Sequence, residues 1–177
     1  MQPLEGGFYN IFNMYGCNGS PGAEQSKIIR GFCGASVQWP TQVSGLGVYT
    51  FGTPSGWELV PVEGERWAYR IRSAECSYDT SSDKCWYWFM GLSDWVHVNT
   101  VEYFDREGDV FYIKPFAKGW KIYPRRHDCD MAKHLTDRCL RSLAWGGGSV
   151  GVRYVGMWAY DYSYHFSFVS IPRPPRA

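Results

Sequence analysis

The sequence contains no uninterrupted apolar stretch of about 20 residues, the length that an α-helix needs to cross a lipid bilayer. The first residues, Met1 to Glu5, also lack the basic and apolar regions of a signal peptide. We therefore expect no membrane insertion and no export signal in the chain itself. The abrupt beginning and end indicate a domain taken from a longer protein.

An excess of charge of one sign is also missing. The chain has 18 Lys and Arg against 17 Asp and Glu, a formal net charge of +1, and no long run of like charges. Such a chain offers no strong field to attract a polyanion, so we do not expect nucleic acid as a partner. We interpret its one basic cluster as a solvated face (Lys114, Lys118, Lys121, Arg125, Arg126).

Most catalytic motifs are absent as well. Gly146 to Gly148 follow an expected helix, whereas a phosphate-binding loop opens one. Gly31-Phe32-Cys33-Gly34 is similar to the turn of a chymotrypsin-like cysteine protease, but every His follows Cys33 in the sequence. We expect a structural Cys33 and a protein that is not an enzyme, while a small cysteine or glycan hydrolase remains an alternative.

One group of side chains has the chemistry of zinc ligands. His127, Cys129, His134 and Cys139 lie within thirteen residues, and three of them could share a helical face. Structural zinc sites usually contain more closely spaced cysteine pairs than this segment offers. We therefore predict no metal site and no cofactor.

Aromatic residues are abundant. They make up 18% of the 177 residues, with nine Trp, thirteen Tyr and ten Phe beside twenty Gly and ten Pro. Aromatic side chains suit pleated surfaces, while Gly and Pro favour turns. The composition predicts a mainly β protein: an antiparallel β-barrel or sandwich with long loops. We expect residues 1–177 to form a single binding domain, with a linker-like C-terminus at 172–177.

Strand patterns occur along much of the chain, without a visible internal repeat. Residues 66–73 alternate between apolar and polar side chains, and 85–90 are apolar on both faces. Residues 96–104 and 110–116 are predicted to form a hairpin. An aromatic stripe at 152–168 is expected to be core, with a dimer interface as the alternative.

One helix is expected near residues 130–144. Met131, Leu135, Cys139 and Leu143 recur at four-residue spacing, and Gly146 provides a stop. Asp128 or Asp130 could cap its N-terminus.

Six cysteines leave fifteen possible disulfide pairings. Cys76 and Cys85 flank a polar loop between two aromatic runs, which places them opposite each other across the mouth of a hairpin. They are the disulfide candidate in an oxidising compartment.

Aromatic residues in turns are the ones that we expect to face a ligand. A Trp ring stacks on the apolar face of a pyranose, and a neighbouring Asp or Arg can bind the sugar hydroxyls. A glycan or a glycosylated receptor is therefore the expected target. The candidate ligand-binding residues are Trp57, Tyr78, Asp94, Trp95 and Trp120.

The general layout resembles the protruding domain of a non-enveloped virus capsid, most of all an astrovirus capsid spike. The resemblance includes an opening from Pro3 to Asn10 that enters a strand, many aromatic strands with long loops, and the exit from Pro172 to Arg176. It implies a non-catalytic, homodimeric β-barrel spike on the virion surface that attaches to a host-cell receptor or glycan and is targeted by antibodies. The alternative is a secreted, extracellular carbohydrate-binding module similar to a lectin.

Overall fold

The protein is mainly antiparallel β. The computed structural model describes residues 2–13, 35–36, 55–90, 95–104, 106–116, 119–127, 141–146, 149–154 and 164–176. Eleven strands and four short 3-10 turns occur within these ranges, and every strand pair is antiparallel. In the same ranges no helix combines the length and the apolarity that crossing a membrane requires.

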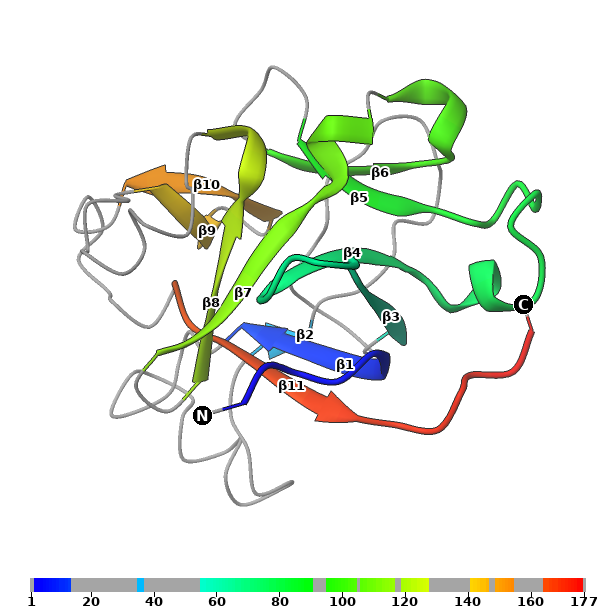
Figure 1. Ribbon diagram of the computed structural model, residues 1–177, viewed down its shortest axis with the longest axis horizontal. Helices are drawn as coiled ribbons and strands as arrows, with labels where there is room; N and C mark the ends of the chain where they lie inside the picture. Colours follow the sequence, from blue (N-terminus) through cyan, green and yellow to red (C-terminus); the bar gives the residue numbers. More distant parts are fainter. Residues whose placement is uncertain are drawn as a thin grey trace.

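Six strands close into a barrel (Figure 1). Each pairs with the next in the cycle β1–β3–β4–β7–β8–β11, and β11 pairs with β1 to close it. A closed barrel leaves none of these strands as an open edge, which removes the usual site of strand-to-strand aggregation. The six strands are β1 (Gly7–Asn13), β3 (Trp57–Pro61), β4 (Ala68–Ser73), β7 (Phe111–Phe116), β8 (Gly119–Pro124) and β11 (Phe166–Ser170).

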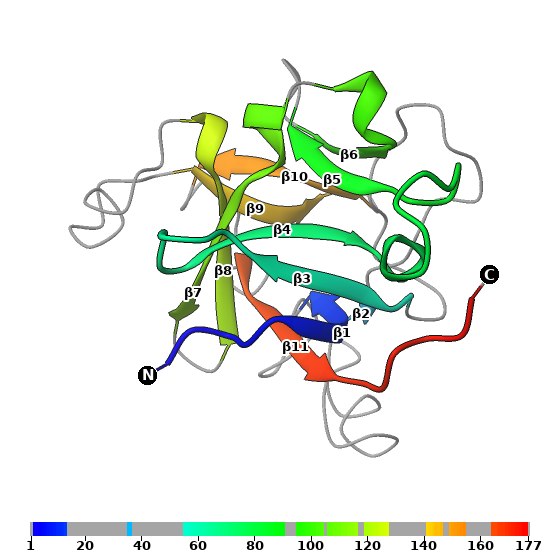
Figure 2. The same cartoon turned by 45° about the vertical axis from the view of Figure 1, so that its right-hand side comes forward.

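The remaining strands lie in the connections between barrel strands. β5 (Tyr87–Met90) and β6 (Val96–Asn99) form a hairpin between β4 and β7, and β9 (Arg141–Gly146) and β10 (Ser149–Tyr154) form one between β8 and β11. These two hairpins lie side by side (Figures 1 and 2). β2 (Ala35–Ser36) has the equivalent place between β1 and β3.

The chain therefore has a threefold repeat that the sequence does not reveal. Each repeat runs from one barrel strand through a connection with its own β-structure to a second barrel strand, over residues 7–61, 68–116 and 119–170. This arrangement is that of a β-trefoil.

The core fills the barrel and its junction with the hairpins. On β4, Tyr69 and Ile71 are buried while Arg70 and Arg72 are not, so the alternation expected for residues 66–73 is present from Tyr69 onward. It fails before that point, because Trp67 precedes the strand and Ala68 is buried. Trp88 on β5 packs edge-on against Trp57 of β3, with ring centroids 5.4 Å apart. This contact joins a hairpin to the barrel. Other fully buried side chains are Ile11, Leu59, Phe111, Ile113, Ile122, Leu143 and Phe166.

The helix expected near 130–144 is wrong at its C-terminal end. Residues 141–146 form β9, which pairs along its whole length with β10. Leu143, the last residue of the four-residue pattern, is fully buried on this strand. A single apolar residue fits either periodicity, so pairing with β10 decides the structure here. Residues 128–140 lie outside the described ranges.

The predicted hairpin between 96–104 and 110–116 is also wrong. β6 pairs with β5, whereas β7 pairs with β4 and β8. Between them lie two 3-10 turns, η2 (Val101–Tyr103) and η3 (Arg106–Asp109). β6 belongs to a hairpin outside the barrel and β7 to the barrel itself, and alternation in a strand does not specify its partner.

The aromatic stripe of 152–168 is divided between two strands. Its first residues lie on β10 and its last on β11, and residues 155–163 are outside the described ranges. Tyr164 and Phe166 are buried, so this end of the stripe is core.

Candidate functional site

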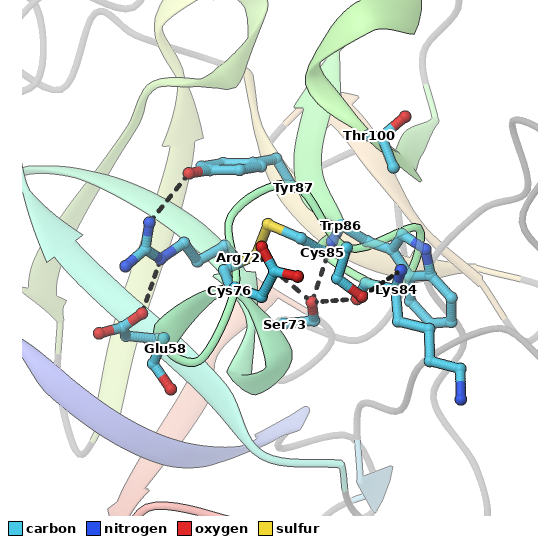
Figure 3. The surroundings of a disulfide bond; sticks show 12 residues. Glu58, Arg72, Ser73, Cys76, Lys84, Cys85, Trp86, Tyr87 and Thr100 are labelled. Atoms are coloured by element: carbon cyan, nitrogen blue, oxygen red, sulfur yellow. Dashed lines mark hydrogen bonds and ion pairs between the residues drawn. A yellow bond between two sulfur atoms is a disulfide. The ribbon is translucent and has the colours of Figure 1, made fainter. Parts of the chain in front are cut away.

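A disulfide closes the loop that follows β4. Cys76, in the 3-10 turn η1 (Ala74–Ser77), is joined to Cys85 just before β5, the pair that the sequence places across a hairpin mouth. Both cysteines are buried. Ser73 fixes the base of the loop, because its Oγ donates to the carbonyl of Lys84 (2.8 Å) and accepts from the N–H of Trp86 (2.9 Å; Figure 3).

Polar contacts order the loop itself. The carboxylate of Asp79 accepts hydrogen bonds from the backbone N–H and the Oγ of Ser81, at 2.9 and 2.6 Å. These bonds, with a smaller contribution from nearby Arg176, lower the pKa of Asp79. The indole Nε1 of Trp86 donates to the carbonyl of Asp83 (2.8 Å), which fixes the orientation of the ring.

A pocket of about 740 Å³ opens between this loop and the segment that follows β6. We call it the polar-aromatic groove. Tyr103 is 71% exposed and Trp86 is half-buried, so both rings are available in part to a ligand. The remaining lining groups are hydroxyls, carboxylates, an amide and an ammonium. The groove is lined by Ser81, Ser82, Asp83, Lys84, Trp86, Asn99, Thr100, Glu102 and Tyr103.

Strand pairing brings the two sides of the groove together. Tyr87 on β5 is the partner of Asn99 on β6, so the residues just outside these strands, Trp86 and Thr100, lie at the same end of the hairpin. The N–H of Tyr103 donates to the carbonyl of Thr100 (3.1 Å) within η2. In Figure 3, Trp86 and Thr100 lie on the opposite side of the disulfide from Arg72 and Tyr87.

The groove is equipped for stacking and hydrogen bonding. Trp and Tyr rings offer flat apolar faces, and the carboxylates of Asp83 and Glu102 accept hydrogen bonds while the amide of Asn99 both donates and accepts. None of the described residues that line the groove is a His or a Cys. In the described part of the chain, no group of three potential metal ligands occurs. Cys33, Cys129, His134 and Cys139 lie outside that part.

Two of the predicted ligand-binding residues are parts of the barrel. Trp57 has no exposed surface and belongs to the core, so its ring has no face for a ligand. Trp120, on β8, packs against the core and lies edge-on to Phe168, with centroids 6.4 Å apart. Pro54-Ser55-Gly56 and Gly119 suggest turns, but β3 begins directly after Gly56 and β8 begins at Gly119 itself.

Tyr78 and Trp95 are not among the residues that line the groove either. Tyr78 lies on the disulfide loop and is 37% exposed, but the guanidinium of Arg173 covers its ring at 3.7 Å. Trp95 is 37% exposed and precedes β6, while Asp94 is outside the described residues.

Sequence reasoning missed Trp86 and Tyr103, the two aromatic residues of the groove. Both lie in runs that were assigned wholly to strands, 85–90 and 96–104. The signal that could have found them is the cluster of polar residues at the ends of these runs, Asp83 and Asn99 with Thr100, which marks the points where the strands stop.

Comparison with known proteins gives a likeness of fold. No family model and no curated protein matches the sequence. The crystal structure of Cry35Ab1 is similar with a TM-score of 0.56 and 13% identity, over 96% of this chain and 37% of that one. This chain thus spans little more than a third of that structure. A Culex salivary protein of the Cysteine and Tryptophan-Rich (CWRC) family is similar with a TM-score of 0.58 and 12% identity, over 97% of this chain and 98% of that one.

Proposed function

We propose that this chain is a non-catalytic binding domain that acts outside cells and takes a glycan in the polar-aromatic groove. The observation that carries the proposal is the position of Trp86 and Tyr103 in a groove whose other lining groups can bind sugar hydroxyls. This deepens the expectation of a glycan-binding protein and moves its site to residues that the sequence did not single out.

The groove is prepared for a ligand before binding. The bond from Trp86 Nε1 to Asp83 fixes the indole, and the disulfide limits the motion of the loop that carries it. A rigid site loses less conformational entropy when it binds. Tyr103 has only two side-chain torsions to fix, so stacking on it is also entropically inexpensive.

An extracellular location is supported by two observations. A disulfide persists in oxidising environments outside the cytosol. The salivary neighbour has nearly the same length, and its family name describes two residue types that are frequent here, with six Cys and nine Trp. Both observations favour the alternative of a secreted carbohydrate-binding module. Attachment to host cells from a virion surface, recognition by antibodies and homodimer formation stay predictions.

Glycan-array screening of the purified domain, followed by calorimetric titration of the best glycan, tests the proposal. We expect Tyr103→Ala and Trp86→Ala each to weaken binding by about tenfold or more, since each removes a stacking face. Trp95→Ala is the matched control for Trp86→Ala, because Trp95 is also a partly exposed tryptophan but is not among the residues that line the groove. Absence of any bound glycan, or equal losses in all three variants, would contradict the proposal.

A further inference from the structure

A second pocket, of about 640 Å³, is lined by four arginines. They come from β4, from η3 and from η4 (Arg125–His127), segments distant in sequence. We call it the arginine pocket. None of its described lining residues lines the polar-aromatic groove. The lining residues are Arg70, Arg106, Glu107, Val110, Arg125 and Arg126.

Two of the arginines share one buried carboxylate. Asp109 has no exposed surface, and the Nε of Arg70 lies 3.2 Å from both of its oxygens. The Nε of Arg106 lies 2.7 Å from its Oδ2. Both guanidiniums therefore use Nε for Asp109, and within the described residues their terminal NH2 groups make no hydrogen bond. These donors belong to residues that line the pocket.

The other two arginines are also held in place. The Nη1 of Arg125 lies 3.0 Å from a carboxylate oxygen of Glu65. The Nη1 of Arg126 donates to the carbonyl of Met90 (2.8 Å), and it lies 3.0 Å from the position that a Cβ on residue 108 would take, so Gly108 leaves room for it. Each guanidinium thus has an internal contact that limits its motion before a ligand arrives.

The charge, the donor geometry and the volume of the pocket suit a small anion. Among the described residues, the four guanidiniums and the carboxylates of Glu65, Glu107 and Asp109 together carry one net positive charge. Planar guanidinium forks suit the paired oxygens of a sulfate or phosphate group, which they bind through two parallel N–H bonds. The pocket volume is that of a typical small-molecule site.

We propose that the arginine pocket binds a sulfate or phosphate ester, with the terminal NH2 groups of Arg70 and Arg106 and the guanidinium of Arg125 as donors to the ester oxygens. The sites for the ester and for the glycan are separate, and each is tested by its own variants.

Titration calorimetry with glucose 6-sulfate, glucose 6-phosphate and glucose tests this, in buffer of low ionic strength. The two esters carry the same sugar, so the comparison identifies which anion is preferred. Arg125→Gln removes the charged partner of Glu65 from a pair whose side chains are 46% and 36% exposed, so the variant should fold. Arg66→Gln is the control, because Arg66 is exposed and near Glu65 in sequence but does not line the pocket.

We expect one or both esters to bind at least about tenfold more tightly than glucose. Arg125→Gln should weaken ester binding by about tenfold, and Arg66→Gln by less than about twofold. Tyr103→Ala, in the groove, should leave ester binding unchanged. The proposal is overturned if neither ester exceeds glucose, or if Arg125→Gln and Arg66→Gln reduce ester binding equally, which would show only a diffuse surface field.

Discussion

Arg173 lies over the ring of Tyr78, with its guanidinium carbon 3.7 Å from the ring centroid. The same guanidinium donates to the carbonyl of Ser77 (3.0 Å) and to its Oγ (3.1 Å), and the hydroxyl of Tyr78 donates to the carbonyl of Pro174 (2.8 Å). The C-terminal segment therefore lies against the disulfide loop (Figure 1). Nearby, Arg176 pairs with the buried Glu75 at 3.0 Å.

Removing the Arg173 side chain should lower the stability of the domain. Arg173→Ala loses a cation–π contact and two hydrogen bonds, so we expect the free energy of unfolding to fall by about 1–2 kcal/mol. Arg66→Ala is the control, because Arg66 also lies over an aromatic ring, Trp67, but makes no hydrogen bond within the described residues. Its loss should stay below about 1 kcal/mol. Urea denaturation measures both, and equal losses would contradict the assigned role of the hydrogen bonds.

The disulfide should matter for stability and for the groove. The Cys76→Ser/Cys85→Ser double variant opens a loop closed by cysteines nine residues apart, and the chain-entropy model gives a loss of about 2–3 kcal/mol. Glycan affinity should also fall, because the freed loop carries Trp86. Guanidinium denaturation and glycan titration report the two effects separately. An unchanged affinity in the folded variant would show that the hydrogen bonds of Ser73, Asp79 and Trp86 order the loop without the disulfide.

The fold class could be predicted from composition, but the threefold repeat could not. Aromatic residues between Gly and Pro turns favour antiparallel strands, and alternation at Tyr69 and Ile71 indicates which face is buried. A β-trefoil repeat depends on which strands pair, and pairing is a long-range property that local alternation does not contain. The false hairpin between 96–104 and 110–116 arose in this way.

The sequence predicted the chemical composition of the candidate site but not the residues that form it. The sequence indicates that aromatic side chains beside polar ones bind a ligand, and the groove has this composition. It does not tell which loops meet. Trp57 follows a turn-like Pro54-Ser55-Gly56, yet it is the first residue of a barrel strand and fully buried. The arginine pocket could not be predicted from the sequence either. Arg70 and Arg125 are 55 positions apart and come to line one pocket only in the folded protein.

The raised pKa of Tyr69 should make the free energy of unfolding decrease at high pH. Its hydroxyl donates to the carbonyl of Leu4 (2.5 Å), and burial, with a smaller effect of nearby Tyr9, raises its pKa from 10.0 to about 12. Between these values the unfolded chain releases a proton that the folded chain keeps, so the unfolded state gains stability as pH rises. Below pH 10 this tyrosine makes no pH-dependent contribution.

Comparing the wild type with Tyr69→Phe isolates this effect. The variant should be less stable by about 1 kcal/mol at pH 8, since the Leu4 carbonyl loses its donor. Between pH 10 and 12 its free energy of unfolding should decline less steeply than that of the wild type. Urea denaturation at several pH values gives both slopes, and parallel slopes would refute the raised pKa.

Replacing Asp109 should lower the stability of the domain more than replacing the other carboxylates that pair with the arginine pocket. Asp109→Asn leaves the guanidiniums of Arg70 and Arg106 beside a neutral amide, with a buried group that cannot accept both bonds equally well. Loss of one partner from a buried ion pair typically costs about 3–5 kcal/mol. Because the two arginine side chains are 31% and 50% exposed, water compensates them in part, and we expect about 2 kcal/mol.

The control for Asp109→Asn is Glu65→Gln, which removes the carboxylate of the more exposed pair with Arg125. It should lower stability by less than about 1 kcal/mol, and this small effect should vanish in high salt. The loss from Asp109→Asn should persist in high salt, because ions do not reach a carboxylate with no exposed surface. Thermal and urea denaturation at low and high salt distinguish the two. A salt-sensitive loss at Asp109 would mean that its carboxylate is open to solvent and does not hold the two arginines for the ester.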